Sequence, residues 1–298
     1  MIVIIGAIIV AASVIGGFLM AGGHVGTLMQ FSEWVVICGS AGGALIIMSP
    51  RRVLVDLGRN LLQTLKGTPY DRDAYTELFK ALYELFTLGR RNGMIALEDH
   101  ISNPQSSSIF AKYPSFIKNE HAVELLCGGL RPIIDGKVKP DQLKLLLETE
   151  LATIEEEHHK PVDVLTKAAD AMPGFGIVAA VLGIVVTMGS IAGPIERIGD
   201  HVAAALVGTF LGILISYGFL NPLAVNMNFL GLAEIAYSRC ITTAVVGFAN
   251  GLSPIMAVEV ARRGLSKDLR PSAEELETIL KSINAPTQAQ AFPQAQAA

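Results

Sequence analysis

The chain has 298 residues, of which 51% are hydrophobic and 17% charged, whereas about 25% of the residues in a typical soluble domain are charged. Its formal net charge of −4 excludes nucleic acid as an expected partner, because binding to phosphates needs clustered cations. The shortage of charge is greatest in residues 1–50, which contain no Lys or Arg and a single acidic residue, Glu33. This bias predicts an integral membrane protein.

Four apolar stretches can each cross the bilayer, which takes about 20 helical residues for about 30 Å of hydrocarbon. They are residues 2–21, 34–48, 172–191 and 202–225, the second being short but extendable through Phe31 and Ser49. None has Asp, Glu, Lys or Arg in its interior. The start of the chain lacks the positive charge of a cleaved signal peptide, so we expect the first stretch to be retained.

The distribution of cations predicts the orientation of these spans. Of the 23 Lys and Arg residues, all but Arg197 lie in residues 51–170 or after Val225. Arg51, Arg52 and nearby cations directly follow the second span, and such an excess marks the cytoplasmic side. We therefore expect both termini in the cytoplasm and the two short loops, 22–33 and 192–201, in the periplasm.

Residues 241–258 contain no charged residue and could be read as a fifth span. Gly247, Asn250 and Pro254 interrupt the stretch, and a fifth span would export the pair Arg262-Arg263, against the positive-inside preference. We interpret it as packed cytoplasmic helix.

The cytoplasmic parts are predicted to be helical. A helix begins near Asp71 and Asp73, has apolar residues at helical spacing, and stops at Asn92-Gly93. A short helix with Glu98 follows it, and an amphipathic helix runs over residues 140–159, with Pro161 and Pro173 expected to bend or restart it. A further helix over 271–280 has a possible capping box in Ser272-x-x-Glu275.

These predictions give an all-α integral membrane protein with four transmembrane helices and a large helical cytoplasmic domain. Its four segments are residues 1–50 (spans one and two), 51–170 (cytoplasmic), 171–225 (spans three and four) and 226–298 (cytoplasmic helices). The Ala/Gln/Pro-rich tail from about residue 285 is expected to be disordered.

Spans three and four carry small residues at helical spacing, which let helices approach closely in lipid. The residues are Gly176, Ala180, Gly183 and Thr187 in span three, with Ala204, Gly208, Gly212 and Ser216 in span four. Packing alone explains the glycines. Hydroxyl groups and prolines gather in the same spans, and a hydrated path along them is the alternative: Thr187, Thr209, Ser216, Tyr217, Pro173 and Pro222.

No site of another kind is predicted. Cys38, Cys127 and Cys240 share no C-x-x-C spacing, so neither a disulfide framework nor a zinc site is expected. The Glu155–His159 run could hold a metal, but adjacent side chains point apart on a helix, which favours a solvated face. Neither an enzyme active site nor a cofactor is predicted, because the phosphate-loop, nucleophile-elbow and H-E-x-x-H patterns are all missing.

Ion-driven membrane proteins place a carboxylate at mid-depth in the bilayer. Because the four spans offer none, we expect a partner to supply it if the protein conducts ions.

Several separated motifs together resemble the A subunit of the bacterial flagellar stator, the MotA family, over essentially the whole chain. They are residues 171–180 (AMPGFGIVAA), 207–214 (VGTFLGIL), 217–222 (YGFLNP), 90–94 with Leu97-Glu98, and 254–259 with Arg262. Gly174 follows Pro173 where the family leads us to expect alanine.

The resemblance implies a ring of A subunits, taken as five, around two helices of a MotB-type B subunit. That subunit has a single span, a membrane aspartate and a peptidoglycan-binding domain. The protein would lie among the lipids of the bacterial inner membrane. Rotor contact with FliG is implied for Arg90 and Glu98, and for Glu150 as a weaker candidate. Coupling and ion-path candidates are Pro173, Ala180, Thr187, Thr209, Tyr217 and Pro222.

The resemblance also favours protons over sodium, because sodium-type relatives carry threonine where this chain has Ala180. Two alternatives stay open at this point. One is an energiser subunit of the TolQ or ExbB kind, although those have three spans and a leading periplasmic segment. The other is a passive channel or membrane scaffold without ion coupling.

Overall fold

The computed structural model describes residues 2–189 and 191–284, leaving out the side chains of residues 196, 197 and 284. Helices make up all the regular structure of the described residues, which confirms the predicted fold class. The predicted disordered tail from residue 285 lies outside the described residues. Contacts divide the chain into two compact units, residues 1–68 with 153–233 and residues 69–152 with 234–298. The predicted four-segment organisation stays a prediction.

The first unit holds the long apolar helices and one charged, amphipathic helix, which begins at Arg51. They are α1 (Ile2–Met20), α2 (Val25–Leu28), α3 (Phe31–Met48), α4 (Arg51–Lys66), the second half of α9 (Pro140–Gly189), α10 (Ile195–Ile213), the π-helix η4 (Leu214–Leu220) and the start of α11 (Asn221–Ala249). Four helices are long and apolar enough to cross a membrane: 2–20, 25–48, 140–189 and 198–249. The second begins earlier than predicted and includes Glu33, so the expectation that ionisable residues lie outside the spans needs correction there.

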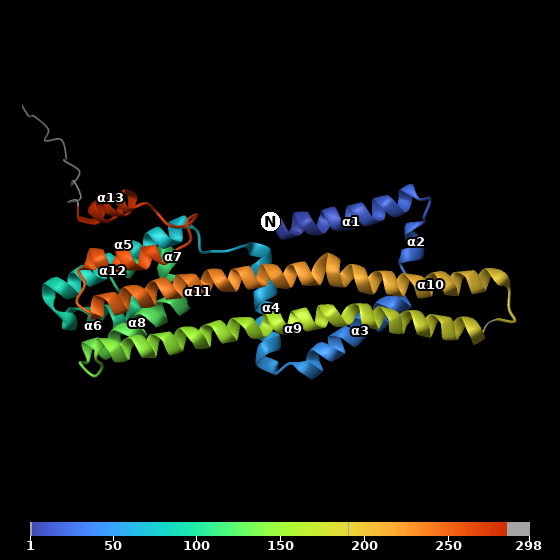
Figure 1. Cartoon of the computed structure of the whole chain (residues 1–298), viewed down its shortest axis with the longest axis horizontal. Helices are drawn as coiled ribbons and strands as arrows, with labels where there is room; N and C mark the ends of the chain where they lie inside the picture. Colours follow the sequence, from blue (N-terminus) through green and yellow to red (C-terminus); the bar gives the residue numbers. More distant parts are fainter. Residues whose placement is uncertain (1, 190, 285–298) are drawn as a thin grey trace, which may run out of the picture. The chain divides into compact units, whose positions relative to one another are not determined.

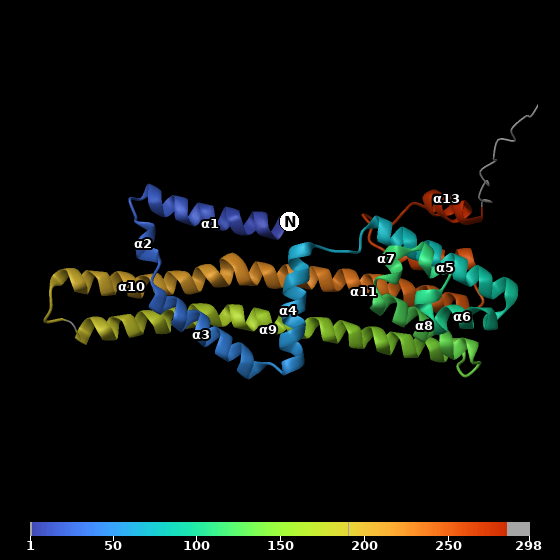
Figure 2. The same cartoon turned by 180° about the vertical axis from the view of Figure 1, so that it is seen from behind.

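The helix α9 runs unbroken through Pro161 and Pro173, so the predicted restart at these prolines is wrong. A proline removes one helical hydrogen bond, and the other bonds of this 50-residue helix carry it through both positions. Figures 1 and 2 show α9 as one continuous helix, with α10 beside its second half. The unbroken helix carries the contacts with α10 from Met172 to Gly183.

The second unit is built around α5 (Arg72–Asn92), whose buried face holds the aromatic and aliphatic residues that the periodicity predicted. Asp71 caps the helix by accepting a hydrogen bond from the N–H of Ala74, and Gly93 ends it with a φ of 86°. The other elements are η1 (Met94–Leu97), α6 (Glu98–Ser102), η2 (Pro104–Ser106), η3 (Phe110–Lys112), α7 (Pro114–Ile117), α8 (Glu120–Ile134), α12 (Pro254–Arg263) and α13 (Ala273–Asn284), with the adjoining parts of α9 and α11.

The stretch read as a possible fifth span is divided between α11 and α12, and Ile241, Ala244 and Val258 are fully buried in the second unit. Phe248 of α11 stacks on Phe86 of α5, with ring centroids 4.3 Å apart. Most of the stretch is therefore packed helix, as the sequence predicted, whereas Ile255 and Met256 of α12 are exposed.

The capping box predicted before α13 is present. The backbone N–H of Glu275 donates to Ser272 Oγ at 3.1 Å, and the N–H of Ser272 donates to Glu275 Oε2 at 2.7 Å. The two residues thus satisfy donors that the helix itself cannot.

Candidate ion-path and rotor-contact sites

Glycines bring α9 and α10 into backbone contact. A Cβ on Gly176 would lie 2.8 Å from the carbonyl oxygen of Gly208, and one on Gly212 would lie 2.7 Å from that of Met172. Real Cβ atoms do not approach backbone atoms so closely, so any side chain here would push the helices apart. This is the close small-residue packing expected of helices in lipid.

The seam keeps the predicted glycines and differs from the predicted stripe at one alanine in each helix. Ala179 and Ala205 are buried, at 1% and 3% exposure, whereas Ala180 and Ala204 are only half-buried. In α10 the predicted stripe kept a strict four-residue spacing, which does not stay on one face of a helix with 3.6 residues per turn. In α9 both Ala179 and Ala180 fit a helical spacing, and it is Ala179 that packs against Gly208 of α10.

The hydroxyl groups expected to line one path face different surroundings. Thr187 is buried and donates to the carbonyl of Gly183 at 2.8 Å. Ser216 is fully buried, Thr209 is half-buried, and Tyr217 is 61% exposed. Thr187 and Ser216 are thus enclosed within this chain, and a hydrated path along these side chains stays a prediction.

A polar bridge that the sequence reading missed lies beside the two prolines. The side-chain amide of Asn221 donates to Asp170 Oδ1 at 3.3 Å and reaches Ser216 Oγ at 3.5 Å. Asn221 directly precedes Pro222, and Asp170 lies three residues before Pro173. The bridge therefore joins the proline-containing turn of α9 to that of α11.

A π-helix ends two residues before Pro222. In η4 the backbone N–H of Asn221 donates to the carbonyl of Ser216, five residues back. Such π segments occur often at functional sites. Pro222, which cannot donate a backbone hydrogen bond, is exposed at the start of α11, and Pro173 is half-buried in α9.

Glu33 is a second residue that the sequence reading did not place in the site. It lies in the first turn of α3 and is 5% exposed, packed against Gly208 of α10. The sequence feature that could have drawn attention to Glu33 is that residues 1–50 contain no other acidic residue and no Lys or Arg. Because the sequence predicted Glu33 to lie in the loop 22–33, its packing against α10 was not predicted.

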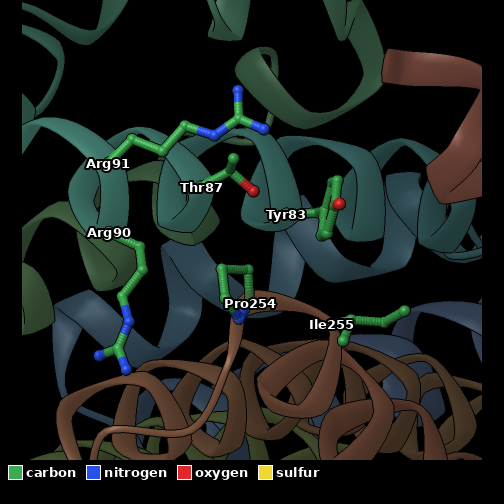
Figure 3. Close-up of a pocket in the computed structure, with 6 residues that line it drawn as sticks. All are labelled: Tyr83, Thr87, Arg90, Arg91, Pro254 and Ile255. Carbon is green, nitrogen blue, oxygen red and sulfur yellow. The ribbon is translucent and has the colours of Figure 1, made fainter. Parts of the chain in front are cut away.

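In the second unit, Arg90 and Arg91 end α5 and are exposed. With Tyr83, Thr87, Pro254 and Ile255 they line a hollow of about 260 Å³. In Figure 3 the side chains of Arg90 and Arg91 extend in opposite directions, with Arg90 on the side where Pro254 lies. The hollow joins two of the motifs that carried the family resemblance, near residues 90 and 254.

The two predicted acidic contacts differ in their surroundings. Glu98 is exposed in the first turn of α6, a short distance along the chain from Arg90. Glu150 is half-buried on α9, well before the apolar part of that helix. Burial, and secondarily the charge of Glu124, raise the pKa of Glu150. An exposed cation and an exposed anion are thus available for partner contact near the end of α5.

The motif around Glu259 is structural. Glu259 holds Arg262 through two hydrogen bonds of 2.7 Å, and Arg262 donates to the carbonyl of Pro271 at 2.7 Å. Arg262 is 8% exposed. Hydrogen bonds from Arg262 lower the pKa of Glu259 to about 2. The network fastens the segment before α13 to α12.

The described residues contain no cluster of three or more His, Cys, Asp or Glu placed to hold a metal ion. The cysteines are free, Cys38 being exposed and Cys127 and Cys240 buried.

Comparisons with known proteins agree with this geometry. Residues 4–93 match the family model described as Motility protein A N-terminal, and residues 117–227 match the MotA/TolQ/ExbB proton channel family. The class defined by the fold and the seam is therefore that of the MotA/TolQ/ExbB membrane proteins.

Motility protein A of Salmonella typhimurium is 34% identical over 295 residues, covering 99% of this chain and 100% of that protein. The chain belongs to the motility protein A (MotA) family.

Solved structures share the fold. The structure of C. jejuni MotAB has a TM-score of 0.75 at 20% identity and covers 91% of this chain and 98% of that one. The flagellar MotAB stator complex from Bacillus subtilis has a TM-score of 0.70 at 21% identity and covers 92% and 98%.

Proposed function

We propose that this chain is the A subunit of a bacterial flagellar stator that forms a proton channel with a B subunit and converts proton flow into torque. The observation that carries the proposal is the match to motility protein A over nearly the full length of both chains. The solved relatives are MotAB complexes, one of them a flagellar stator. Four spans and the match to the motility-protein model over residues 4–93 favour this function over an energiser subunit or a passive scaffold.

The membrane part supports a two-component channel. The apolar part of α9 and the part of α10 after His201 carry no acidic residue, and Glu33 lies in the first turn of α3. The carboxylate at mid-depth would therefore come from the single span of the B subunit. The proton gradient supplies about 2.3 kcal/mol per charge per 100 mV. Thr209, Tyr217 and Ala180 would line the path, with Thr187 supporting it from within α9.

We assign coupling to the region around Pro173 and Pro222. The Asp170–Asn221–Ser216 bridge joins α9 to α11 there, and protonation of the B-subunit acid would change the charge that this region faces. Movement would pass along α9 and α11, because each helix runs without a break from the first unit into the second.

The assembly would be a ring of five copies around two B-subunit helices, in the lipid of the inner membrane, with both termini in the cytoplasm. Arg90 and Glu98 would contact the rotor protein FliG, with Glu150 as a weaker contact. Their exposure at the end of α5 and the start of α6 supports rotor contact for the first two.

Complementation tests the proposal. The chain with its own B subunit should restore swimming to a bacterium that lacks both stator subunits, and Arg90→Glu should reduce torque while assembly continues. Lys118→Glu, which reverses an exposed charge on the same unit, is the control and should swim normally. Swimming that follows sodium and ignores collapse of the proton gradient would contradict proton drive. No swimming, despite normal assembly with the B subunit, would contradict the stator assignment.

A further inference from the structure

Glu33 is an acid buried without a full set of partners. Its Oε1 accepts a long hydrogen bond of 3.4 Å from Ser32 Oγ, while Oε2 is buried and has no hydrogen-bond partner. The residue is 5% exposed and lies in a helix long and apolar enough to span the membrane. The side chain does not cap α3, so satisfying the helix end does not explain it.

Gly208 makes the space that this carboxyl group occupies. A Cβ on Gly208 would lie 2.5 Å from Glu33 Oε2 and 3.1 Å from the Cβ of Ala179. The carboxyl group thus sits in a notch where α3, α9 and α10 meet, and α3 crosses the α9–α10 pair in Figures 1 and 2. Thr209, the ion-path candidate, is the next residue on α10.

The helices around the notch offer few charges. Residues 2–28, which form α1 and α2, contain His24 as their single ionisable group, and α9 has none between Ala171 and Gly189. On α10 the described ionisable side chains are Asp200 and His201; the sequence adds Glu196 and Arg197, whose side chains are outside the described part. No described cation pairs with Glu33.

His201 lies on the same face of α10 as the notch, since it precedes Gly208 by seven residues, about two helical turns. Its Nδ1 atom is buried and has no partner. Gly183 of α9 lies opposite Ala205, and the antiparallel register therefore places Thr187 level with His201. His201 of α10 and Glu33 of α3, each with a buried polar atom that has no hydrogen-bond partner, thus lie along the same side of α10.

The chemistry of the notch fits a proton and no larger ion. Metal cations need about six oxygen ligands, and this site offers one carboxyl group and one hydroxyl group among glycine and alanine. A charged carboxylate with a free oxygen is costly in an apolar surrounding, and taking up one proton removes that charge.

We propose that Glu33 is a protonation site inside the membrane unit that takes up and releases one proton on the route through the stator, with His201 as the group that feeds it. The imidazolium of His201 gives up its N–H proton, and a chain of water molecules carries a proton over the two helical turns, about 10 Å, to the Glu33 carboxylate. This leaves neutral imidazole and a carboxylic acid. The acid then passes the proton to the carboxylate of the B subunit. This transport role rests on the proposed function, whereas protonation of Glu33 itself can be tested without a rotor.

Modification by a hydrophobic carbodiimide tests the site in the full A–B complex in membranes. The reagent reacts with protonated carboxyl groups in apolar surroundings, and peptide mass spectrometry locates the adduct. We expect an adduct at Glu33 that declines as pH rises and does not change when sodium replaces potassium. No adduct at Glu33 at acidic, neutral or alkaline pH would overturn the proposal, as would protection by sodium.

Proton flux tests the transport role. Glu33→Gln keeps the shape but cannot titrate, so we expect a several-fold lower flux and an altered dependence on pH, whereas Glu33→Asp, which keeps the carboxyl group, should conduct more than Glu33→Gln. Equal flux in Glu33→Gln and wild type at every pH would overturn the transport role. If the wild-type complex itself carries no flux, the proposed function fails, while the carbodiimide result on wild type still decides whether Glu33 takes up a proton.

Discussion

Replacing Gly176 with alanine would place a methyl group 2.8 Å from the carbonyl oxygen of Gly208 and 3.2 Å from the Cα of Gly212. Both atoms belong to the backbone, so the contact can be relieved only by moving α9 and α10 apart. Overpacking of this kind costs about 1–3 kcal/mol. Alanine also forms helix better than glycine, by about 1 kcal/mol, which offsets part of that cost.

Gly174→Ala is the matched control, because Gly174 lies on the same helix and a Cβ there would meet nothing within 4 Å. Both variants gain the same helix preference, so their difference isolates packing, and Gly176→Ala should be less stable by about 1–3 kcal/mol. The assay is unfolding of the purified chain in mild detergent, followed by circular dichroism of the helical signal. Equal stability of the two variants would refute the close approach of α9 and α10.

Three further changes test other parts of the structure. Glu259→Gln should destabilise the second unit. Because the folded-state pKa of Glu259 is lowered to about 2, the stabilisation by the Glu259 carboxylate is present above about pH 4.5 and is lost as pH falls toward 2. A stability advantage of the wild type over Glu259→Gln that grew on acidification would contradict this pKa. Ser272→Ala removes the cap of α13 and should cost about 1 kcal/mol, measured by thermal unfolding; no loss would contradict the capping box. Asn221→Leu breaks the bridge to Asp170 and should lower swimming speed without lowering membrane abundance on immunoblots; unchanged speed would show that the bridge does not take part in coupling.

The sequence predicted the helices well where the pattern was local. Asp71 and Gly93 mark the ends of α5 because capping and a positive φ depend on a few neighbouring residues. The same holds for the capping box of α13. The four apolar spans could also be predicted, since hydropathy over about 20 residues is a strong signal.

The site could be predicted only in part, because it depends on contacts between helices. Helical spacing along each single helix selected Ala180 and Ala204, whereas the register of the two helices buries Ala179 and Ala205. Likewise, Glu33 looks like a loop residue until α3 is seen to begin at Phe31. The residue that packs against a glycine such as Gly208 lies on another helix, so it cannot be predicted from the sequence of one helix alone.

The π-helix before Pro222 was not predicted because η4 has no sequence signal of its own: residues 214–220 read as ordinary apolar helix. At Pro161 and Pro173 the sequence predicted a bend or restart of the helix, whereas the long α9 continues through both prolines.

Proton flux into liposomes tests the central claim most directly. The purified chain would be reconstituted alone and together with its B subunit, a proton gradient would be imposed, and internal pH would be followed with a fluorescent dye. We predict rapid proton entry when both subunits are present and loss of that entry when the membrane aspartate of the B subunit is replaced by asparagine. The same rate of proton entry through the chain alone would contradict the account.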